Sequence, residues 1–339
     1  MSFNILAIES SCDETSAAIL DSGKVLSNVI SSQYFHKEYG GIVPELASRA
    51  HVTTIEKITK EAFKLAGISI NEINLAAASQ GPGLIGSLLI GLNFAKGFAV
   101  SNNIPFVGID HIESHLYSSF IGSEDIEFPF IALVVSGGHT ILFLAESETR
   151  YKVLGTTQDD AAGEAFDKVA KMLGLEYPGG PLIDKLAKDG DSNFHKFPVS
   201  NIKGSPYDFS FSGIKTSVLY YLKKNFPAGV SGNDLNNISA SFQKAVVSSL
   251  VSKTIKAAKD NDIKNISVSG GVSANSALRQ EFRKYENEGY RVSFPDKIYS
   301  TDNAAMIGYT AYLKYRNSYT AIPAAALLEG AYARFKYNS

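Results

Sequence analysis

Two segments of this chain share one plan, in which a short polar turn joins two apolar strands. The first has apolar residues at 4–8 and 17–20 around polar residues 9–15, and the second has apolar runs at 130–135 and 141–145 around residues 136–140. The two segments lie about 127 residues apart, which is too far for a solenoid repeat and suits two related domains. Elsewhere apolar strands alternate with helical stretches, which is typical of an α/β fold. The sequence therefore predicts an α/β protein with two related sheet cores.

The length of the chain supports a division into two domains. Its 339 residues are 45% hydrophobic, which is enough for two separate cores. We expect a first domain over residues 1–125, a crossing near residues 122–125, and a second domain with a helical insertion over residues 126–300. The remaining residues, 301–339, would return toward the first domain through a helix that begins near Asp302.

Charge and cysteine content limit the surroundings in which the chain works. The net charge of −2 provides no overall basic field for nucleic acid, so such a partner would need a local patch or a helper protein. The single cysteine, Cys12, excludes an internal disulfide and fits a reducing compartment. The N-terminus lacks a basic signal-peptide region, and the longest apolar stretch, residues 84–100, is interrupted by Asn93 and Lys96. We expect a cytoplasmic protein in which this stretch forms a buried helix.

A pair of histidines four residues apart, His111 and His115, follows an apolar strand expected at residues 104–109 and begins a helical stretch. Residues i and i+4 lie on one helix face, about 5–6 Å apart at Cβ, so both imidazoles can reach one metal ion. Two surface histidines without a metal are the alternative, and a third ligand must come from elsewhere. Asp302 is the best candidate, although an acid at the start of the last helix would also suit capping.

The position of Glu113 argues against a metalloprotease. In the motif His-Glu-x-x-His, the glutamate beside the first histidine acts as the base. Here Glu113 stands two residues after His111, which on a helix turns it roughly 200° away from that histidine. The sequence therefore predicts a metal site without the protease base.

Glycine-rich turns that follow strands could hold phosphate. Residues 136–140 and 267–276 both contain Ser-Gly-Gly after an apolar strand, and the backbone N–H groups of such turns can bind phosphate oxygens. We expect a nucleotide or acyl-phosphate ligand, with purely structural turns as the alternative. Residues 81–86 match Gly-x-Gly-x-x-Gly, and Asp110 lies where a ribose-binding acid would stand, so an NAD-dependent dehydrogenase is a rival. Because this motif does not follow the first strand, we interpret it as a tight strand-to-helix turn.

Acidic residues crowd the first polar turn. Glu9, Asp13 and Glu14 stand between two apolar strands, and their mutual repulsion would be relieved by a cation or by a proton on one of them. An ordinary solvated turn is the alternative. A second acidic run, residues 159–167, fits one helix face and is in part ordinary helix surface.

Taken together, these motifs resemble those of one known family along essentially the whole chain. They comprise residues 9–15, 40–51, 81–89, 111–115, 134–140, 167, 177–181, 209–216, 241–243, 270–275 and 301–303. The chain resembles the tRNA N6-adenosine threonylcarbamoyltransferase (TsaD) family, once described as O-sialoglycoprotein endopeptidases. Ser114 is a small departure, since the family commonly has glycine there.

The resemblance implies a two-domain actin-like fold, shared with sugar kinases and Hsp70-type ATPases, with duplicated β-sheet cores around a nucleotide cleft. It also implies a reaction. The threonylcarbamoyl group of threonylcarbamoyl-AMP would pass to N6 of the adenosine 3′ of the anticodon, in tRNAs that read codons beginning with adenine. A small-molecule kinase of the same fold and a non-catalytic nucleotide-binding subunit are the alternatives.

Particular residues acquire expected roles from this resemblance. A metal ion would be held by His111, His115 and Asp302, with Fe(II) favoured and Zn(II) as the alternative, and Mg²⁺ could accompany a bound nucleotide. Our hypothesis for the acid–base group near the attacking amine is Asp13 or Glu14. The residues expected to bind the substrate all lie in the second domain: Val134, Val135, Ser136, Gly137, Gly138, Asp167, Gly180, Asp184 and Asn275.

The expected partners are tRNA and, by resemblance to the bacterial family, a smaller paralogous subunit and an ATPase subunit, with no membrane. Residues 84–98, a glycine-rich helical stretch, could form a close helix–helix interface with a partner or could pack within the chain. Five basic residues are candidates for tRNA phosphate contacts, with solvated surface as the alternative: Arg49, Lys203, Lys215, Lys244 and Arg279.

Overall fold

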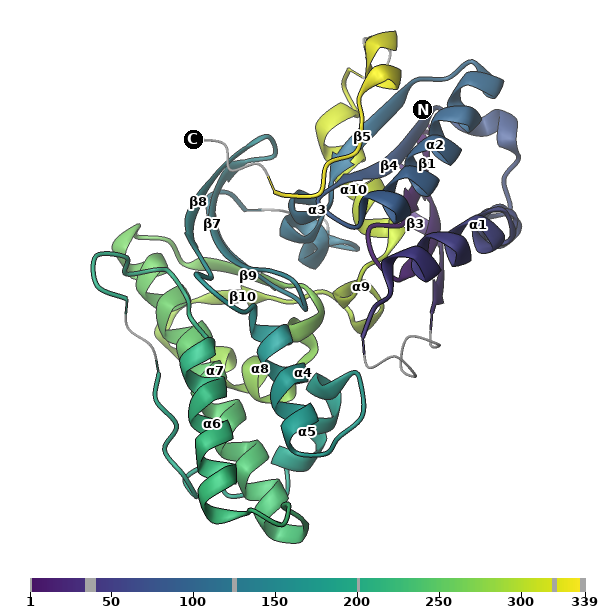
Figure 1. Cartoon of the computed structure of the whole chain (residues 1–339). Coiled ribbons are helices and arrows are strands. Elements are labelled where there is room, and N and C mark those ends of the chain that lie inside the picture. Colours follow the sequence, from purple (N-terminus) through teal and green to yellow (C-terminus); the bar gives the residue numbers. More distant parts are fainter. Residues whose placement is uncertain (1, 34–40, 124–126, 200–201, 319–321, 336–339) are drawn as a thin grey trace. The chain divides into compact units, whose positions relative to one another are not determined.

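The computed structural model describes residues 2–33, 41–123, 127–199, 202–318 and 322–335 (Figure 1). The chain forms two compact units. Unit 1 comprises Met1–Ile126 together with Thr301–Ser339, and unit 2 comprises Glu127–Ser300. The expected domain boundary at residue 125 and the first residue of the motif at 40–51 lie outside the described residues.

Unit 1 is built on a five-stranded sheet with the order β3-β2-β1-β4-β5. The strands are β1 (Asn4–Glu9), β2 (Glu14–Asp21), β3 (Lys24–Ser32), β4 (Leu75–Gly81) and β5 (Phe106–Asp110). The first three pair antiparallel through short turns, while β4 and β5 are parallel to β1 and are reached through helices. This mixed sheet places the carboxyl ends of β1, β4 and β5 at one edge, where ligands commonly bind in α/β proteins.

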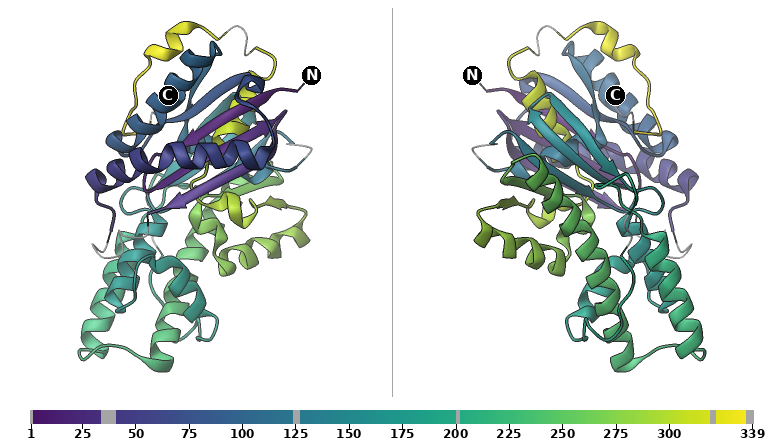
Figure 2. Two further views of the ribbon diagram at one scale, coloured as in Figure 1. Left: turned by 90° about the vertical axis from the view of Figure 1, so that its right-hand side faces the viewer. Right: turned by 90° about the vertical axis from the view of Figure 1, so that its left-hand side faces the viewer.

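Helices cover both faces of this sheet (Figure 2). Leu6 and Ile8 of β1 are fully buried in one hydrophobic core with α1 (Pro44–Ala66) and α2 (Ile85–Asn102). On the opposite face, α10 (Ala304–Tyr315) approaches so closely that a Cβ atom on Gly308 would lie 2.2 Å from Leu20 Cδ1. Side chains alternate between the two faces along a strand, so the apolar run in β1 supplies both layers.

The apolar stretch 84–100, expected to be a buried helix, is α2, but only one of its faces is buried. Its buried residues recur at helical spacing, including Leu88, Leu92, Ala95 and Ala99, whereas Ile85 and Leu89 are exposed on the other face. The reason is that a helix lying on a sheet can contact it with one face only. Among the described residues, no helix is long and apolar enough to span a membrane.

Unit 2 repeats the sheet of unit 1, with the order β10-β9-β6-β7-β8. Its strands are β6 (Phe130–Val135), β7 (Thr140–Ser147), β8 (Arg150–Thr156), β9 (Asn265–Ser269) and β10 (Arg291–Ser293). The directions also match, because β6, β7 and β8 pair antiparallel while β9 and β10 run parallel to β6. The duplicated α/β sheet core predicted from the two strand–turn–strand segments is confirmed.

A group of helices separates β8 from β9 in the sequence and forms most of the core of unit 2. The helices are α4 (Ala162–Met172), α5 (Gly179–Ala187), α6 (Ser212–Asn225) and α7 (Gly232–Asp260). The 29-residue α7 runs beside α6 (Figure 1), and its Phe242, Val246 and Leu250 are fully buried in the core. After β9 come the short helix α8 (Ser276–Arg283) and then α9 (Lys297–Ser300).

Candidate active site

The two histidines lie on α3 (His111–Tyr117), which begins directly after β5. Asp110 caps this helix, since its carboxylate accepts a hydrogen bond from the backbone N–H of Glu113 at 2.9 Å. His111 and His115 are both buried, and their ring centres lie 4.8 Å apart in an edge-to-face arrangement. The helix therefore presents both imidazoles on one side, as their spacing predicted.

Asp302 meets both histidines. Its Oδ1 lies 3.1 Å from His115 Nε2 and 3.5 Å from His111 Nε2. One ligand atom from each of the three residues lies within 4.8 Å of the other two. Asp302 is not the cap of α10, because the side chain of Asn303 accepts the hydrogen bond from Met306 N. Capping therefore does not explain the presence of Asp302 at this position.

The carboxylate of Glu9 orients the ring of His111 through Nδ1, the ring nitrogen that does not face Asp302. Its Oε2 lies 3.0 Å from His111 Nδ1, and its Oε1 accepts a hydrogen bond from the backbone N–H of Ser11. A carboxylate that accepts from Nδ1–H fixes the tautomer and leaves the Nε2 lone pair free for a metal. His115 differs, because its Nδ1 is buried without a hydrogen-bond partner among the described residues. Two imidazoles and a carboxylate with such an orienting group fit a divalent transition metal ion.

Burial and the acidic residues of the site shift the pKa values of its titratable side chains. Burial opposes the imidazolium of His111, yet the carboxylates of Asp302 and Glu9 raise the pKa of His111 to about 9. Burial, followed by the charges of Asp302 and Asp13, raises the pKa of Glu14 well above its ordinary value. Burial and the neighbouring carboxylates likewise raise the pKa of Cys12, so its thiol stays protonated. A bound cation would relieve this concentration of negative charge.

A histidine that the sequence analysis did not single out holds the acidic turn in place. His51 on α1 is fully buried, with its Nε2 3.0 Å from the carbonyl oxygen of Cys12 and its Nδ1 2.8 Å from Thr15 Oγ1. A carbonyl can only accept, so Nε2 donates to it, and in the neutral imidazole Nδ1 then accepts from the threonine hydroxyl. His51 thereby bridges the two ends of the turn that carries Asp13 and Glu14.

In unit 2, the turn formed by Ser136, Gly137 and Gly138 has free space beside both of its glycines. A Cβ atom on Gly137 or Gly138 would meet no atom within 4 Å, and both residues are exposed. Val134 and Val135, expected to line the substrate beside them, are instead fully buried at the end of β6. Their side chains pack in the interior because this strand is central in its sheet, so the accessible part of the predicted set begins at Ser136.

Three of the other four residues expected to bind substrate, Asp167, Asp184 and Asn275, make hydrogen bonds at the N-termini of α5 and α8. Asp167 accepts from the backbone N–H of Gly179, beside Gly180, at 2.8 Å. Asp184 accepts from both the backbone N–H and the hydroxyl of Ser276. The side chain of the preceding Asn275 caps α8 and donates to Gln243 at 2.7 Å. Each carboxylate retains lone pairs that could accept from further hydroxyl groups.

Comparison with known proteins identifies the family. The model of TsaD, tRNA N6-adenosine threonylcarbamoyltransferase, matches residues 24–309. This chain belongs to that family. Proteins named tRNA N6-adenosine threonylcarbamoyltransferase include one from Chloroherpeton thalassium, 52% identical over 324 residues, and one from Geotalea uraniireducens, 52% identical over 306 residues. The alignments cover 92% of each chain for the first and 89% of each chain for the second.

The solved structures that the chain resembles confirm the fold. T. kodakarensis HypF superposes with a TM-score of 0.65 at 14% identity, over 94% of this chain and 49% of that chain. Component A of (R)-2-hydroxyglutaryl-CoA dehydratase from Acidaminococcus fermentans gives a TM-score of 0.52 at 16% identity, over 92% of this chain and 98% of that chain. Together with the two matching sheets, these likenesses confirm the predicted actin-like ATPase fold.

Membership of the TsaD family also confirms the predicted activity. The chain is an acyltransferase that places a threonylcarbamoyl group on N6 of a tRNA adenosine. Among the rival classes, a dehydrogenase is further opposed by the environment of residues 81–86. Other parts of the same chain fill the space beside these glycines, where a dinucleotide would have to lie. A Cβ on Gly83 would lie 2.5 Å from the carbonyl oxygen of Ser11, and one on Gly86 would lie 2.5 Å from Ser48 Oγ. These residues form the strand-to-helix turn between β4 and α2.

Most of the basic residues expected to contact tRNA make contacts within the chain itself. Lys215 pairs with Asp160, and Arg279 donates to the carbonyl oxygens of Ser273 and Pro295. Arg49 pairs with Glu45 and Lys244 with Asn193, both in exposed positions, while Lys203 is exposed.

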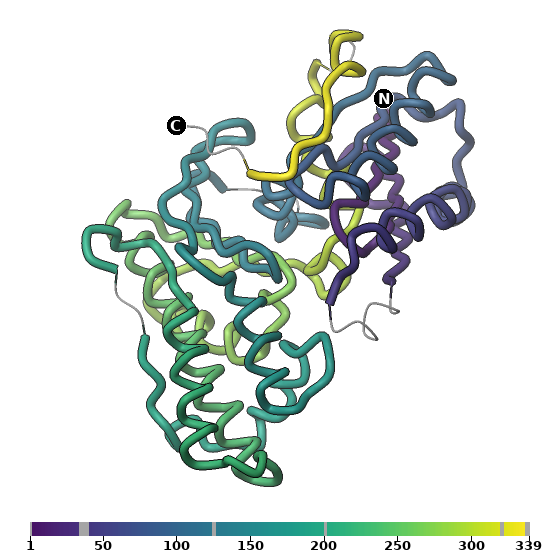
Figure 3. Tube along the Cα trace, in the orientation of Figure 1, coloured from purple at the N-terminus to yellow at the C-terminus, as the bar shows by residue number. Residues whose placement is uncertain are grey.

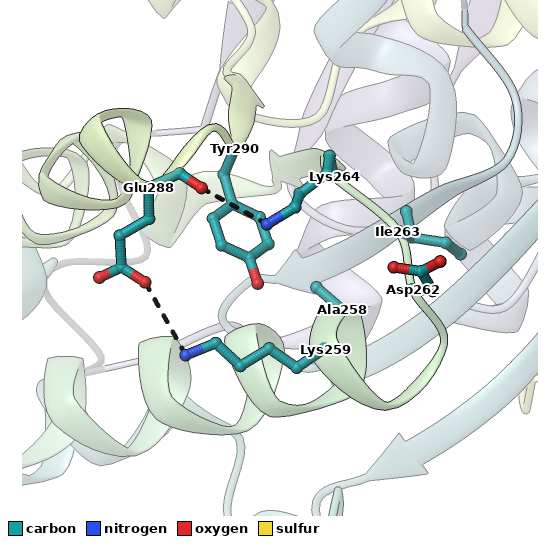
Figure 4. Close-up of a pocket in the computed structure, with 7 residues that line it drawn as sticks. All are labelled: Ala258, Lys259, Asp262, Ile263, Lys264, Glu288 and Tyr290. Atoms are coloured by element: carbon teal, nitrogen blue, oxygen red, sulfur yellow. Dashed lines mark hydrogen bonds and ion pairs between the residues drawn. The ribbon is translucent and has the colours of Figure 1, made fainter.

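A small pocket in unit 2, of about 200 Å³, contains none of the predicted site residues (Figure 4). Within it, Lys259 faces Glu288 at 3.8 Å and Lys264 lies 4.1 Å from the ring centre of Tyr290. The pocket carries no arrangement of groups that the transfer reaction would use.

Proposed function

We propose that this TsaD-family chain performs its transfer with one divalent metal ion held by His111, His115 and Asp302. The convergence of their three ligand atoms within 4.8 Å carries this proposal. Fe(II) is the preferred metal and Zn(II) the alternative, since two imidazoles and a carboxylate suit both. When bound, the ion would act as a Lewis acid that polarises a carbonyl or phosphate oxygen of the donor.

The donor in this proposal is threonylcarbamoyl-AMP, and the acceptor is the adenosine 3′ of the anticodon in tRNAs that read codons beginning with adenine. The adenine N6 amine attacks the carbamoyl carbon and forms a C–N bond. The C–O bond to the phosphate then breaks, and AMP leaves with the electron pair. An exocyclic amine is a weak nucleophile, so positioning of the two partners supplies much of the rate.

The proton lost by the amine would pass to Asp13 or Glu14. The raised pKa of Glu14, caused by burial and by the charges of Asp302 and Asp13, supports a role as acid–base group. His51 would keep the turn that carries both acids in one conformation through its contacts to Cys12 and Thr15.

For the adenylate part of the donor we propose Asp167, Gly180, Asp184 and Asn275 in unit 2. The two carboxylates would accept hydrogen bonds from ribose hydroxyls. The open backbone at Gly137 and Gly138 permits close approach of a phosphate or acyl group, and Mg²⁺ could accompany a bound nucleotide. The buried side chains of Val134 and Val135 would fix the end of β6, from which this turn begins.

Partner subunits complete the proposal. The net charge of −2 argues that other proteins share the tRNA surface, and we propose a smaller paralogous subunit and an ATPase subunit as these partners, in the cytoplasm. The exposed Ile85, Leu89 and Val100 on α2 support a helix–helix interface there.

The test is transfer of radiolabelled threonine from threonylcarbamoyl-AMP to unmodified tRNA, with purified chain and candidate partner subunits. We expect wild type and the exposed control Asp189→Asn to label tRNA, and His111→Ala and Asp302→Asn to lose both label and bound metal. Full labelling by Asp302→Asn after removal of metal by a chelator would refute the metal site. Normal turnover by both Asp13→Ala and Glu14→Ala would refute their acid–base role.

A further inference from the structure

The C-terminal segment, residues 329–334, is part of the yellow end of the trace in Figure 3, and it contacts Gln80 of β4 and Lys96 of α2 in unit 1. Gln80, the second-last residue of β4, makes hydrogen bonds to this segment through both its backbone and its side chain. Its backbone carbonyl accepts from Tyr332 N at 3.1 Å, and its side-chain Nε2 donates to the carbonyl oxygen of Gly330 at 3.0 Å. Lys96 on α2 donates to the carbonyl oxygen of Glu329. This segment lies beyond the residues 24–309 that match the family.

Two glycines leave room for these contacts. A Cβ atom on Gly81 would lie 2.3 Å from the carbonyl oxygen of Tyr332 and 2.5 Å from its ring. A Cβ atom on Gly108 would lie 2.6 Å from Oε1 of Gln80, the side chain that holds the segment. Real Cβ atoms do not approach so closely, so the path of the C-terminal segment depends on both positions being glycine.

The segment reaches the metal helix through one hydrogen bond. The hydroxyl of Tyr332 donates to Asp110 Oδ2 at 2.6 Å, while Oδ1 of the same carboxylate accepts from Glu113 N at the start of α3. The hydroxyl of Ser114 also donates to the carbonyl oxygen of Asp110. Asp110 is thus fixed at both oxygens, and it directly precedes His111.

We propose that Tyr332 is a positioning residue for the metal site. By holding Asp110 in its capping rotamer, the tyrosine sets the start of α3 and thereby directs His111 and His115 at Asp302. A short helix of seven residues has few internal hydrogen bonds, so its orientation depends strongly on how its first turn is held. The link to metal rests on the proposed function, whereas the link from Tyr332 to α3 stands without it.

The first experiment compares wild type with Tyr332→Phe, which removes the hydroxyl alone. Tyr312→Phe is the control, because that tyrosine packs against Gly23 in the same unit. Amide hydrogen exchange of metal-free protein should show faster exchange across α3 in Tyr332→Phe only. Titration with Co²⁺, followed by its visible absorption, should show roughly tenfold weaker binding, the lower end of what loss of outer-shell partners causes.

A double-mutant cycle tests whether the tyrosine acts through Asp110. Asn is a good capping residue, so Asp110→Asn keeps the cap but weakens the bond to the phenol. In this background Tyr332→Phe should change Co²⁺ affinity much less than in wild type. Unchanged α3 exchange in Tyr332→Phe would overturn the proposal, as would full additivity in the cycle. Absence of Co²⁺ binding by wild type would instead refute the metal site, and the exchange result would still decide the role of Tyr332.

Discussion

The carboxylate of Glu113 accepts two hydrogen bonds from the ammonium group of Lys314, at 2.9 and 3.2 Å. The pair joins α3 to α10, the two helices that position the candidate metal ligands, and Glu113 is only 4% exposed. A glutamate held this way faces away from the histidines and cannot serve as the base of a metalloprotease. The contact therefore explains a glutamate between two histidines as a structural residue.

Removal of Lys314 should destabilise unit 1. Lys314→Met leaves the buried Glu113 carboxylate unpaired, which costs about 3 kcal/mol of unfolding free energy. Urea denaturation should show this loss, with most of it recovered in the double variant Glu113→Gln, Lys314→Met. The exposed pair of Lys60 and Glu56 provides the control, since Lys60→Met should leave the midpoint unchanged. Equal midpoints for Lys314→Met and wild type would contradict this role.

Metal affinity should rise with pH. Asp302 and Glu9 raise the pKa of His111 from its ordinary 6.5 to about 9, so a metal must displace a proton at neutral pH. Apparent affinity should therefore increase by about tenfold per pH unit and level off near pH 9. In metal-free protein the sign is opposite: the stabilisation by protonated His111 is complete below about pH 6.5 and is lost as pH rises through 9. Co²⁺ titrations and metal-free melting curves across this range check both slopes.

His51 should matter for both stability and turnover. His51→Leu leaves the carbonyl oxygen of Cys12 and the hydroxyl of Thr15 without their buried partner, at about 1–3 kcal/mol for each group. Because the turn between them carries Asp13 and Glu14, kcat should fall while bound metal stays near one per chain. Thr15→Val, which removes one of the two contacts, should show a smaller loss of stability. Unchanged kcat in His51→Leu would mean that the turn needs no such support.

Two helix glycines should respond in opposite directions to alanine. Gly308→Ala places a Cβ 2.2 Å from the fully buried Leu20, so overpacking should cost about 1–3 kcal/mol. Gly97→Ala, on the exposed face of α2 with no atom within 4 Å of its Cβ, should stabilise the chain by up to about 1 kcal/mol. Thermal unfolding of the two variants gives the comparison, and a stabilised Gly308→Ala would show that α10 can move away from the sheet.

The sequence was sufficient to predict what depends on local periodicity. The apolar runs fixed the strands and their duplication, and the four-residue spacing placed His111 and His115 on one face of a helix. Contacts between residues far apart in the chain left no such signal. Glu113 with Lys314 and Asp110 with Tyr332 are 201 and 222 residues apart, and no pattern around either partner indicates the other. Glu9 was noticed as part of an acidic turn, but its role in orienting His111 required the structure.

Burial and internal contacts add what motif position and charge pattern alone do not contain. Val134 and Val135 belong to a central strand and their side chains are fully buried, while their predicted place beside the substrate stays a prediction. Lys215 and Arg279 bind groups of their own chain, which the charge pattern of the sequence could not distinguish from free surface cations.

Unit 1 is interrupted in the sequence by the whole of unit 2, and this order has a consequence during synthesis. His111 and His115 leave the ribosome early, but Asp302 and Tyr332 follow only after all residues of unit 2 have been translated. Domains generally fold as the nascent chain emerges. The site residues of unit 1 therefore come together as one of the last events in the biogenesis of this protein, when α10 joins a sheet whose strands were made first.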